Sequence, residues 1–161
     1  LHSMLFWLYG DLSQSKYVQL SISLPFILIV SGIIYIFSRH LNLIVGGEES
    51  ALQMGVQVEL LKWISFLGIS LITGIVVSFS GIIGFVGLIV PHLMRMILGP
   101  DHRLLIPASA LGGAVFLIAA DTLARTIISP SELPVGVITA FLGAPFFIYL
   151  LKSRGSQWTQ S

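Results

Sequence analysis

Residues 61–98 read LKWISFLGISLITGIVVSFSGIIGFVGLIVPHLMRMIL, and this stretch decides the class of the protein. Its long central part carries no charge, whereas a membrane-spanning helix needs only about 20 apolar residues. The stretch is therefore too long for one crossing. Ser-Phe-Ser-Gly at 78–81 interrupts it, and further glycines follow. We expect one helix over 61–80 and a shorter helix over about 82–98 that returns across the membrane.

Uncharged stretches also lie on either side of this region. They cover residues 18–38, 104–120 and 133–151, and each fits a single spanning helix. The sequence thus predicts an all-α fold, a polytopic transmembrane helical bundle that forms one domain over residues 1–161. About five membrane helices are expected, over residues 18–39, 61–80, 82–98, 104–127 and 134–151.

The composition supports a membrane protein and excludes several other classes. Of 161 residues, 55% are hydrophobic and 9% are charged, and the mean hydropathy is +0.97. A soluble domain normally carries about 25% charged residues, so a soluble enzyme is excluded. A net charge of +1 provides no basic field for nucleic acid. Because the chain has no cysteine, it has no disulfide, no thiolate metal site and no cysteine nucleophile.

The distribution of Lys and Arg predicts the orientation of the bundle. With five crossings, six of the eight Lys and Arg residues fall on one side, and only Lys16 and Arg125 fall on the other. Positive residues concentrate in cytoplasmic loops, so we assign the larger group and the C-terminus to the cytoplasm. A count of four helices would remove this asymmetry. The larger group is Arg39, Lys62, Arg95, Arg103, Lys152 and Arg154.

The segment over residues 44–60 lies on the predicted cytoplasmic side and is unusual for a short connection. Glu48 and Glu49 follow two glycines and would complement the dipole at the start of a helix, and Gly55 would end it. An apolar face outside the bilayer has to be covered. It either packs on the interfacial surface or inserts into a cytoplasmic partner protein. That face consists of Ala51, Leu52 and Met54, and a second short element is expected at Val56, Val58 and Leu60.

Asp121 and Arg125 are spaced for an ion pair on one helical face, with the acid before the base. They lie near the predicted outer interface. Either the two side chains neutralise each other there, or the arginine is offered to a partner or a solute.

Small residues recur at helical spacing in two of the predicted helices. Because lipid provides little hydrophobic force between helices, close approach over small side chains supplies the packing. We expect these stripes to pack helices together, and the prolines to kink them. The stripes are Ser70, Gly74 and Ser78, and Gly136, Ala140 and Ala144 with Gly143 beside them; the prolines are Pro25, Pro91, Pro107 and Pro145.

No catalytic or metal site is predicted. His92 lies within a helix and His102 in a turn, with no carboxylate or thiolate to complete a ligand set. Asp101 is more simply the N-cap of the next helix. An intramembrane hydrolase with Ser78 or Ser80 as nucleophile and His92 as base remains an alternative, although it lacks a Gly-x-Ser-x-Gly setting. A structural subunit of a larger membrane complex is a further alternative.

Several ordered motifs resemble one transporter family. Gly-Glu-Glu-Ser-Ala-Leu-Gln-Met-Gly at 47–55 is similar to the coupling-helix motif of FecCD-type ABC permeases, which import iron–siderophores, haem and cobalamin. The resemblance is co-linear over nearly the whole chain. It continues through the motifs at residues 81–95, 99–103, 120–125, 132–136 and 143–147.

The resemblance implies that the chain corresponds to the C-terminal half of a type II importer permease, which has ten helices. The chain begins with Leu1 rather than Met, which fits a fragment. One departure concerns Leu52, since family members commonly carry arginine after the motif alanine. That difference places one polar contact to the ATPase in doubt.

The resemblance also implies partners and site residues. The partners are a cytoplasmic ATP-binding subunit, an extracytoplasmic substrate-binding protein, a second permease subunit and the lipid bilayer of a bacterial or archaeal cytoplasmic membrane. No cofactor and no enzymatic activity are implied. ATPase coupling is assigned to Gly47, Glu48, Glu49, Ala51, Leu52, Met54 and Gly55 within the 44–60 segment. Docking of the binding protein is assigned to Arg125, and the translocation path and dimer interface to Gly136, Thr139, Ala140, Gly143 and Pro145.

Overall fold

The described part of the protein is built from α-helices, as the sequence predicts. The computed structural model describes residues 8–12, 16–127 and 133–155, and no strand occurs within these ranges. The helices are α2 (Tyr17–Ile36), α3 (Ser38–Val45), α4 (Glu48–Gln53), α5 (Val58–Ser80), α6 (Val86–Leu98), α7 (His102–Ile127) and α8 (Val135–Gly155).

The long helices have the properties of membrane spans. Helices α2, α5 and α7 are long and apolar enough to cross a bilayer, with hydropathies of 2.0, 2.0 and 1.9 over their most apolar windows. Only 6%, 6% and 11% of these windows is buried within the chain. In water such exposed apolar surface would promote aggregation, whereas in a bilayer it contacts lipid or other helices. Helix α6 and the apolar part of α8 are shorter.

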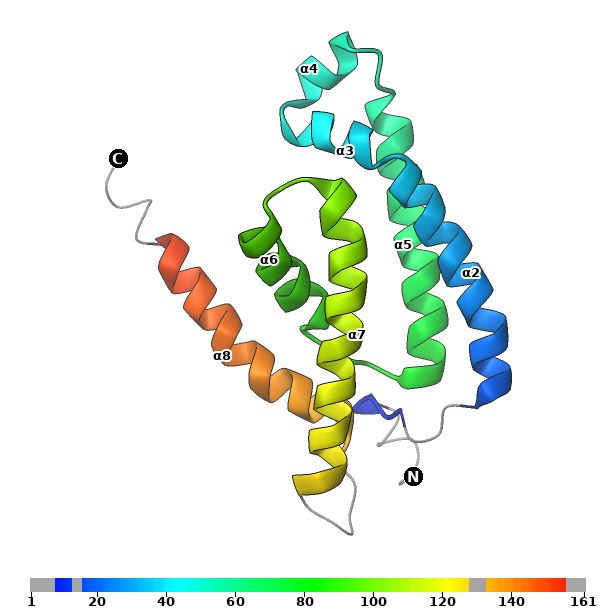
Figure 1. The fold of residues 1–161 in the computed structure, drawn as a ribbon, viewed down its shortest axis with the longest axis vertical. Helices are drawn as coiled ribbons and strands as arrows, with labels where there is room; N and C mark the ends of the chain where they lie inside the picture. Colours follow the sequence, from blue (N-terminus) through cyan, green and yellow to red (C-terminus); the bar gives the residue numbers. More distant parts are fainter. Residues whose placement is uncertain (1–7, 13–15, 128–132, 156–161) are drawn as a thin grey trace.

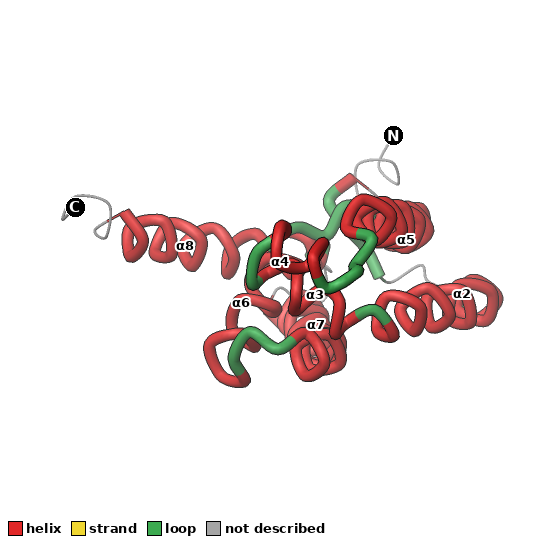
Figure 2. Tube along the Cα trace, turned by 90° about the horizontal axis from the view of Figure 1, so that it is seen from above, coloured by secondary structure: helices red, strands yellow, loops and turns green. Residues whose placement is uncertain are grey.

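The helices form two groups, and at one end α3, with α4 beside it, joins them through its contacts with α7 (Figure 1). Helix α2 packs along α5, and α6 packs along α7. Helix α8 contacts α7 and α6 through its first half and then diverges from them, as the view from above also shows (Figure 2). We call the end that holds α3, α4 and the start of α7 the α4 end, and the end that holds the last turn of α7 the Arg125 end.

The first spanning helix is shorter than predicted. It ends at Ile36, and α3 begins at Ser38 instead of continuing α2. Phe37 between them leaves helical geometry, with φ −83° and ψ 4°. The break lets Phe37, Leu41 and Ile44 pack on a buried cluster beside α4. The tertiary contacts of these side chains thus decide where the helix ends.

The predicted helix from about residue 82 begins later, at Val86. The preceding turn contains Phe85 in the left-handed region, with φ 67°, which costs a non-glycine residue about 1–3 kcal/mol. Two backbone N–H groups of α6, those of Leu88 and Ile89, donate to the Phe85 carbonyl. The Phe85 side chain is packed against Gly143 of α8. The turn therefore takes its shape from contacts with α6 and α8, which hydropathy does not report.

The small-residue stripe expected on α5 does not pack closely against other helices among the residues that the structure describes. Its members Ser70, Gly74 and Ser78 are exposed. The close approach of α5 to α2 occurs instead at Gly68, where an added Cβ would lie 3.0 Å from Val30 Cγ1. Likewise, the second short element expected after Gly55 is absent from the described residues 56–60, because Val58 already begins α5.

Candidate functional site

Helix α4 begins and ends where the sequence predicts. Gly47 precedes it with φ 135°, and Glu48 and Glu49 occupy its first turn. At its end, the N–H of Gly55 donates to Leu52 O at 2.9 Å, and the N–H of Val56 donates to Ala51 O at 3.0 Å. This pair of bonds, with Gly55 at φ 82°, is a Schellman motif. A helix this short is marginal alone, so both caps and the packing beneath it are needed.

The apolar residues of α4 divide between two faces. Ala51 is 1% exposed and belongs to a buried cluster with Val56, Val58 and Leu61. Leu52 and Met54 are 57% and 67% exposed and face away from that cluster. The patch predicted at these three residues is therefore split. Ala51 packs α4 against α3 and α5, whereas Leu52 and Met54 present an apolar surface outward.

An ion pair also joins α4 to α5. Lys62 Nζ lies 2.8 Å from the Glu48 carboxylate and 3.7 Å from that of Glu59. These side chains are about half exposed or more, so solvent screens both pairs and they contribute little to stability. The pair orients the first turn of α4 over α5, while the buried cluster supplies most of the attachment.

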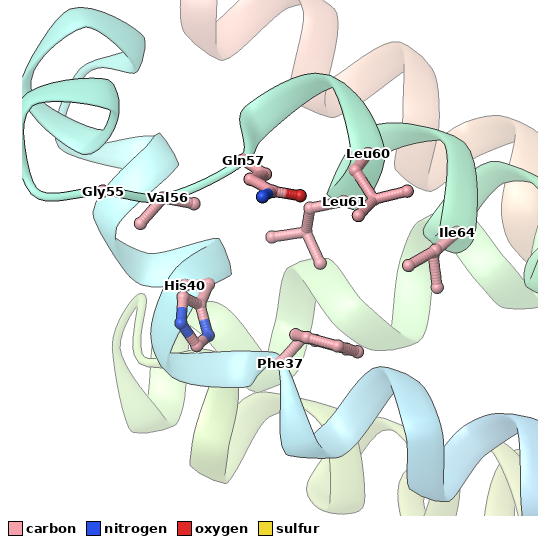
Figure 3. A pocket seen from close by; sticks show the side chains of 8 residues that line it. All are labelled: Phe37, His40, Gly55, Val56, Gln57, Leu60, Leu61 and Ile64. Atoms are coloured by element: carbon pink, nitrogen blue, oxygen red, sulfur yellow. The ribbon is translucent and has the colours of Figure 1, made fainter.

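A pocket of about 220 Å³ lies under this segment, between the α2–α3 break and the start of α5. Figure 3 shows Phe37 from one side and Leu61 from the other facing each other across it. Most of its lining is apolar, and its polar side chains are His40 and Gln57. It has no set of ligands for a metal or a phosphate.

At the Arg125 end, the predicted ion pair is formed. Arg125 Nε lies 2.8 Å from Asp121 Oδ2, and the two side chains are 43% and 26% exposed. Both side chains therefore stay partly accessible while they neutralise each other.

The small residues of α8 pack against this chain itself. An added Cβ at Gly136 would lie 2.9 Å from Ile82 O and would overlap the Tyr9 carbonyl, and one at Gly143 would overlap the Phe85 side chain. The Gly136 N–H donates to Gly10 O at 3.3 Å. The other predicted residues of α8 differ in exposure: Thr139 is fully buried, Ala140 is partly buried and Pro145 is exposed.

The residues considered for catalysis do not assemble. The hydroxyls of Ser78 and Ser80 donate to carbonyls of their own helix, at 2.7 and 2.9 Å. His92 makes an edge contact with Phe146 of α8, with ring centroids 6.4 Å apart. Among the residues that the structure describes, no three His, Asp or Glu side chains are grouped to hold a metal ion.

Asp101 is the N-cap of α7, as predicted, and it also binds a residue that the sequence did not single out. Asp101 Oδ1 accepts the Arg103 N–H at 2.9 Å and the side-chain N–H of Asn42 at 2.7 Å. Both bonds hold the pKa of the Asp101 carboxyl below its usual value, and the bond from the Arg103 N–H has the larger effect. Asn42 comes from α3, 59 residues away in the chain. No local pattern connects the two residues, which is why sequence reasoning missed Asn42.

Comparison with known proteins agrees with this architecture. The FecCD transport family matches residues 1–153. The chain is 47% identical over 150 residues to the cobalamin import system permease protein BtuC of Halobacterium salinarum, covering 93% of this chain and 40% of that protein. It is 43% identical over 151 residues to the hemin transport system permease protein HmuU of Yersinia pestis, covering 94% of this chain and 45% of that protein.

A solved structure, an inward-facing ABC transporter described as metal-chelate type, superposes with a TM-score of 0.85 at 38% identity. The match covers 95% of this chain and 49% of that one. The chain thus spans about half the length of the relatives that it matches. Its helices, its capped α4 segment and the family match over residues 1–153 lead to one conclusion: this multi-pass membrane chain belongs to the FecCD transport family.

Proposed function

We propose that this chain forms the C-terminal half of the membrane permease of an ABC importer. The importer moves a metal chelate of the cobalamin, haem or siderophore class inward, driven by ATP hydrolysis in a partner subunit. The chain itself performs no bond chemistry. The observation that carries the proposal is α4, a short helix capped at both ends, held outside the spanning helices and presenting Leu52 and Met54 outward.

In this proposal α4 docks on the cytoplasmic ATP-binding subunit. Leu52 and Met54 enter an apolar groove of that subunit, and Glu49 lies beside them on the exposed surface. Gly47 and Gly55 supply the backbone turns that hold the helix outward. Ala51 has a supporting role from beneath, because its methyl group is buried in the chain's own cluster.

The orientation follows from the same assignment. The α4 end would face the cytoplasm and the Arg125 end would face outward. Arg39, Lys62 and Arg103 belong to helices or turns at the α4 end, in agreement with the concentration of positive charge on the inner side. The C-terminus after α8 would then also be cytoplasmic.

At the outer face, Arg125 would receive a carboxylate of the substrate-binding protein. Its pairing with Asp121 means that docking exchanges one carboxylate partner for another, so the arginine is never left unneutralised in between. Helix α8 would border the translocation path and a second permease subunit. Because Gly136 and Gly143 already pack within the chain, that role falls to the exposed part of the helix, which includes Pro145.

The test uses the full-length permease co-expressed with its ATP-binding subunit. The double variant Leu52→Glu/Met54→Glu places charge on the exposed face of α4 without entering the buried cluster. We expect it to remain folded but to lose co-purification of the ATP-binding subunit and uptake of labelled cobalamin, haemin or ferric siderophore. Ala51→Glu is unsuitable, because it would bury a charge and unfold the segment.

The control is Gln57→Glu, which adds one negative charge, half the charge of the double variant, at an exposed position just beyond α4. It should keep both association and uptake. If the double variant still binds the ATP-binding subunit and transports as the wild type does, α4 is not the docking element. A purely structural subunit, the alternative function, would show no transport in the wild-type complex.

A further inference from the structure

We propose that Asn42 is a positioning residue that connects α3 to the start of α7, so that a displacement of α4 reaches the spanning helices through α3. This inference rests on the proposed function, since it assumes that α4 is moved by an ATP-binding partner. The juxtaposition that carries it is the Asn42 side chain of α3 against the turn that begins α7.

The Asn42 amide uses both of its polar atoms on this turn. Its nitrogen donates to Asp101 Oδ1 at 2.7 Å. Its oxygen accepts the backbone N–H of His102 at 2.9 Å and lies 2.7 Å from His102 Nδ1. The oxygen can accept from both only if the imidazole carries a proton on Nδ1, which defines the tautomer. One partly buried side chain thus meets three polar groups of the α7 start.

The bond to Asp101 has a second consequence, because Asp101 also caps α7. Its Oδ1 accepts the N–H of Arg103 at 2.9 Å, in the first turn of that helix. The unpaired N–H groups at a helix start carry the positive end of its dipole. Asn42 therefore holds the carboxylate that caps the N-terminal start of α7. A shift of α3 would act directly on that start.

Helix α3 has two faces with different partners. Leu41 and Ile44 pack on the buried cluster that contains Ala51 of α4. Asn42, on another face, contacts the α7 start. Because the helix is interrupted at Phe37, between α2 and α3, α3 is not a rigid continuation of the first spanning helix. It can move with α4, and the Asn42 contacts then determine whether α7 follows.

Chemistry explains why an amide suits this position. An aspartate at 42 would set a carboxylate against Asp101, and an apolar residue would leave the His102 N–H without its acceptor. Asparagine supplies a donor towards the acid and an acceptor towards the backbone on two separate atoms of one short side chain. The amide is therefore matched to its partners as a donor–acceptor pair.

The experiment measures coupling separately from folding and docking. The full-length permease with its ATP-binding subunit and binding protein is reconstituted in liposomes. Labelled cobalamin, haemin and a ferric siderophore are tried on the wild type, and the one transported is used thereafter. The readout is the amount transported per ATP hydrolysed, with co-purification of the ATP-binding subunit and the thermal midpoint recorded for each variant.

Asn42→Asp should leave the ATP-binding subunit bound but lower the amount transported per ATP. We expect a decrease of roughly fivefold or more, because coupling between two sites typically changes an equilibrium by at least that factor. Asn42→Asp combined with Asp101→Asn exchanges amide and acid and restores the donor–acceptor pair, so transport per ATP should recover. Gln57→Ala removes an exposed amide at the same end and should have no effect. A merely structural role would lower the thermal midpoint and leave the ratio unchanged.

The outcomes separate the two levels of the proposal. If Asn42→Asp transports as efficiently per ATP as the wild type, or if the exchange variant fails to recover, Asn42 does not position α7 and the inference is wrong. In that case the proposed function stands, because the wild type still transports. If the wild-type complex transports none of the three chelates, the proposed function is overturned, and this inference with it.

Discussion

Replacing Gly143 by alanine gives the sharpest test of how α8 is packed. A Cβ at this position would overlap the Cβ and ring of Phe85, whose backbone already lies in the left-handed region. Because the clash includes Cβ and not the far end of a flexible side chain, the helices must separate. Overpacking costs about 1–3 kcal/mol, against a gain in helix propensity of about 1 kcal/mol. With the strained turn unable to yield, we place the net loss near 2 kcal/mol.

The matched control is Gly113→Ala in α7. An added Cβ there would lie 4.0 Å from Val86 Cγ1, an ordinary contact, so the variant should gain up to about 1 kcal/mol from propensity. Thermal unfolding of the full-length permease in detergent, followed by size-exclusion chromatography, should place Gly143→Ala roughly 2–4 °C below the wild type, because the shift per kcal/mol falls as chain length grows. If Gly143→Ala is as stable as Gly113→Ala, α8 does not pack on the Phe85 turn.

Two further predictions concern buried and capping polar groups. The Thr139 hydroxyl is fully buried and donates to the Gly136 carbonyl at 3.1 Å, so Thr139→Val should lower the free energy of unfolding by about 1 kcal/mol. The same change at exposed Thr126 should cost less, and equal thermal midpoints for the two would contradict this. The pKa of the Asp101 carboxyl is lowered by its hydrogen bonds, so its stabilisation is complete above the usual aspartate pKa and is lost as pH falls through the lowered value. The difference in thermal midpoint between wild type and Asp101→Ala should therefore shrink in acid, and a constant difference down to low pH would refute the assignment.

Most of the architecture could be predicted because its signals are local. The spans α5 and α7 begin within a few residues of the predicted positions, since each depends on a run of apolar residues. The caps of α4 and α7 were also predictable, because glycine and aspartate act on the backbone within one turn. The exceptions are the C-terminal end of α2 and the start of α6. There Phe37 and Phe85 take conformations that depend on neighbours from other helices.

The candidate docking residues show the same division more finely. Composition placed Ala51, Leu52 and Met54 together as an apolar group on α4. Only the tertiary structure separated them, because it covers Ala51 with α3 and α5 and leaves the other two exposed. This changes which substitutions test docking and which test folding.

Sequence by itself determined that this chain belongs in a bilayer, where its spans lie and how α4 is capped. The reason is that transfer of a helix into lipid and capping of its ends depend on residues close together in the chain. Tertiary structure alone decided the rest: the contact of Asn42 with Asp101, the inward face of Ala51 and the packing of Gly143 on Phe85. Each joins segments that are distant along the chain, and the free energy of such a contact depends on how whole helices cross.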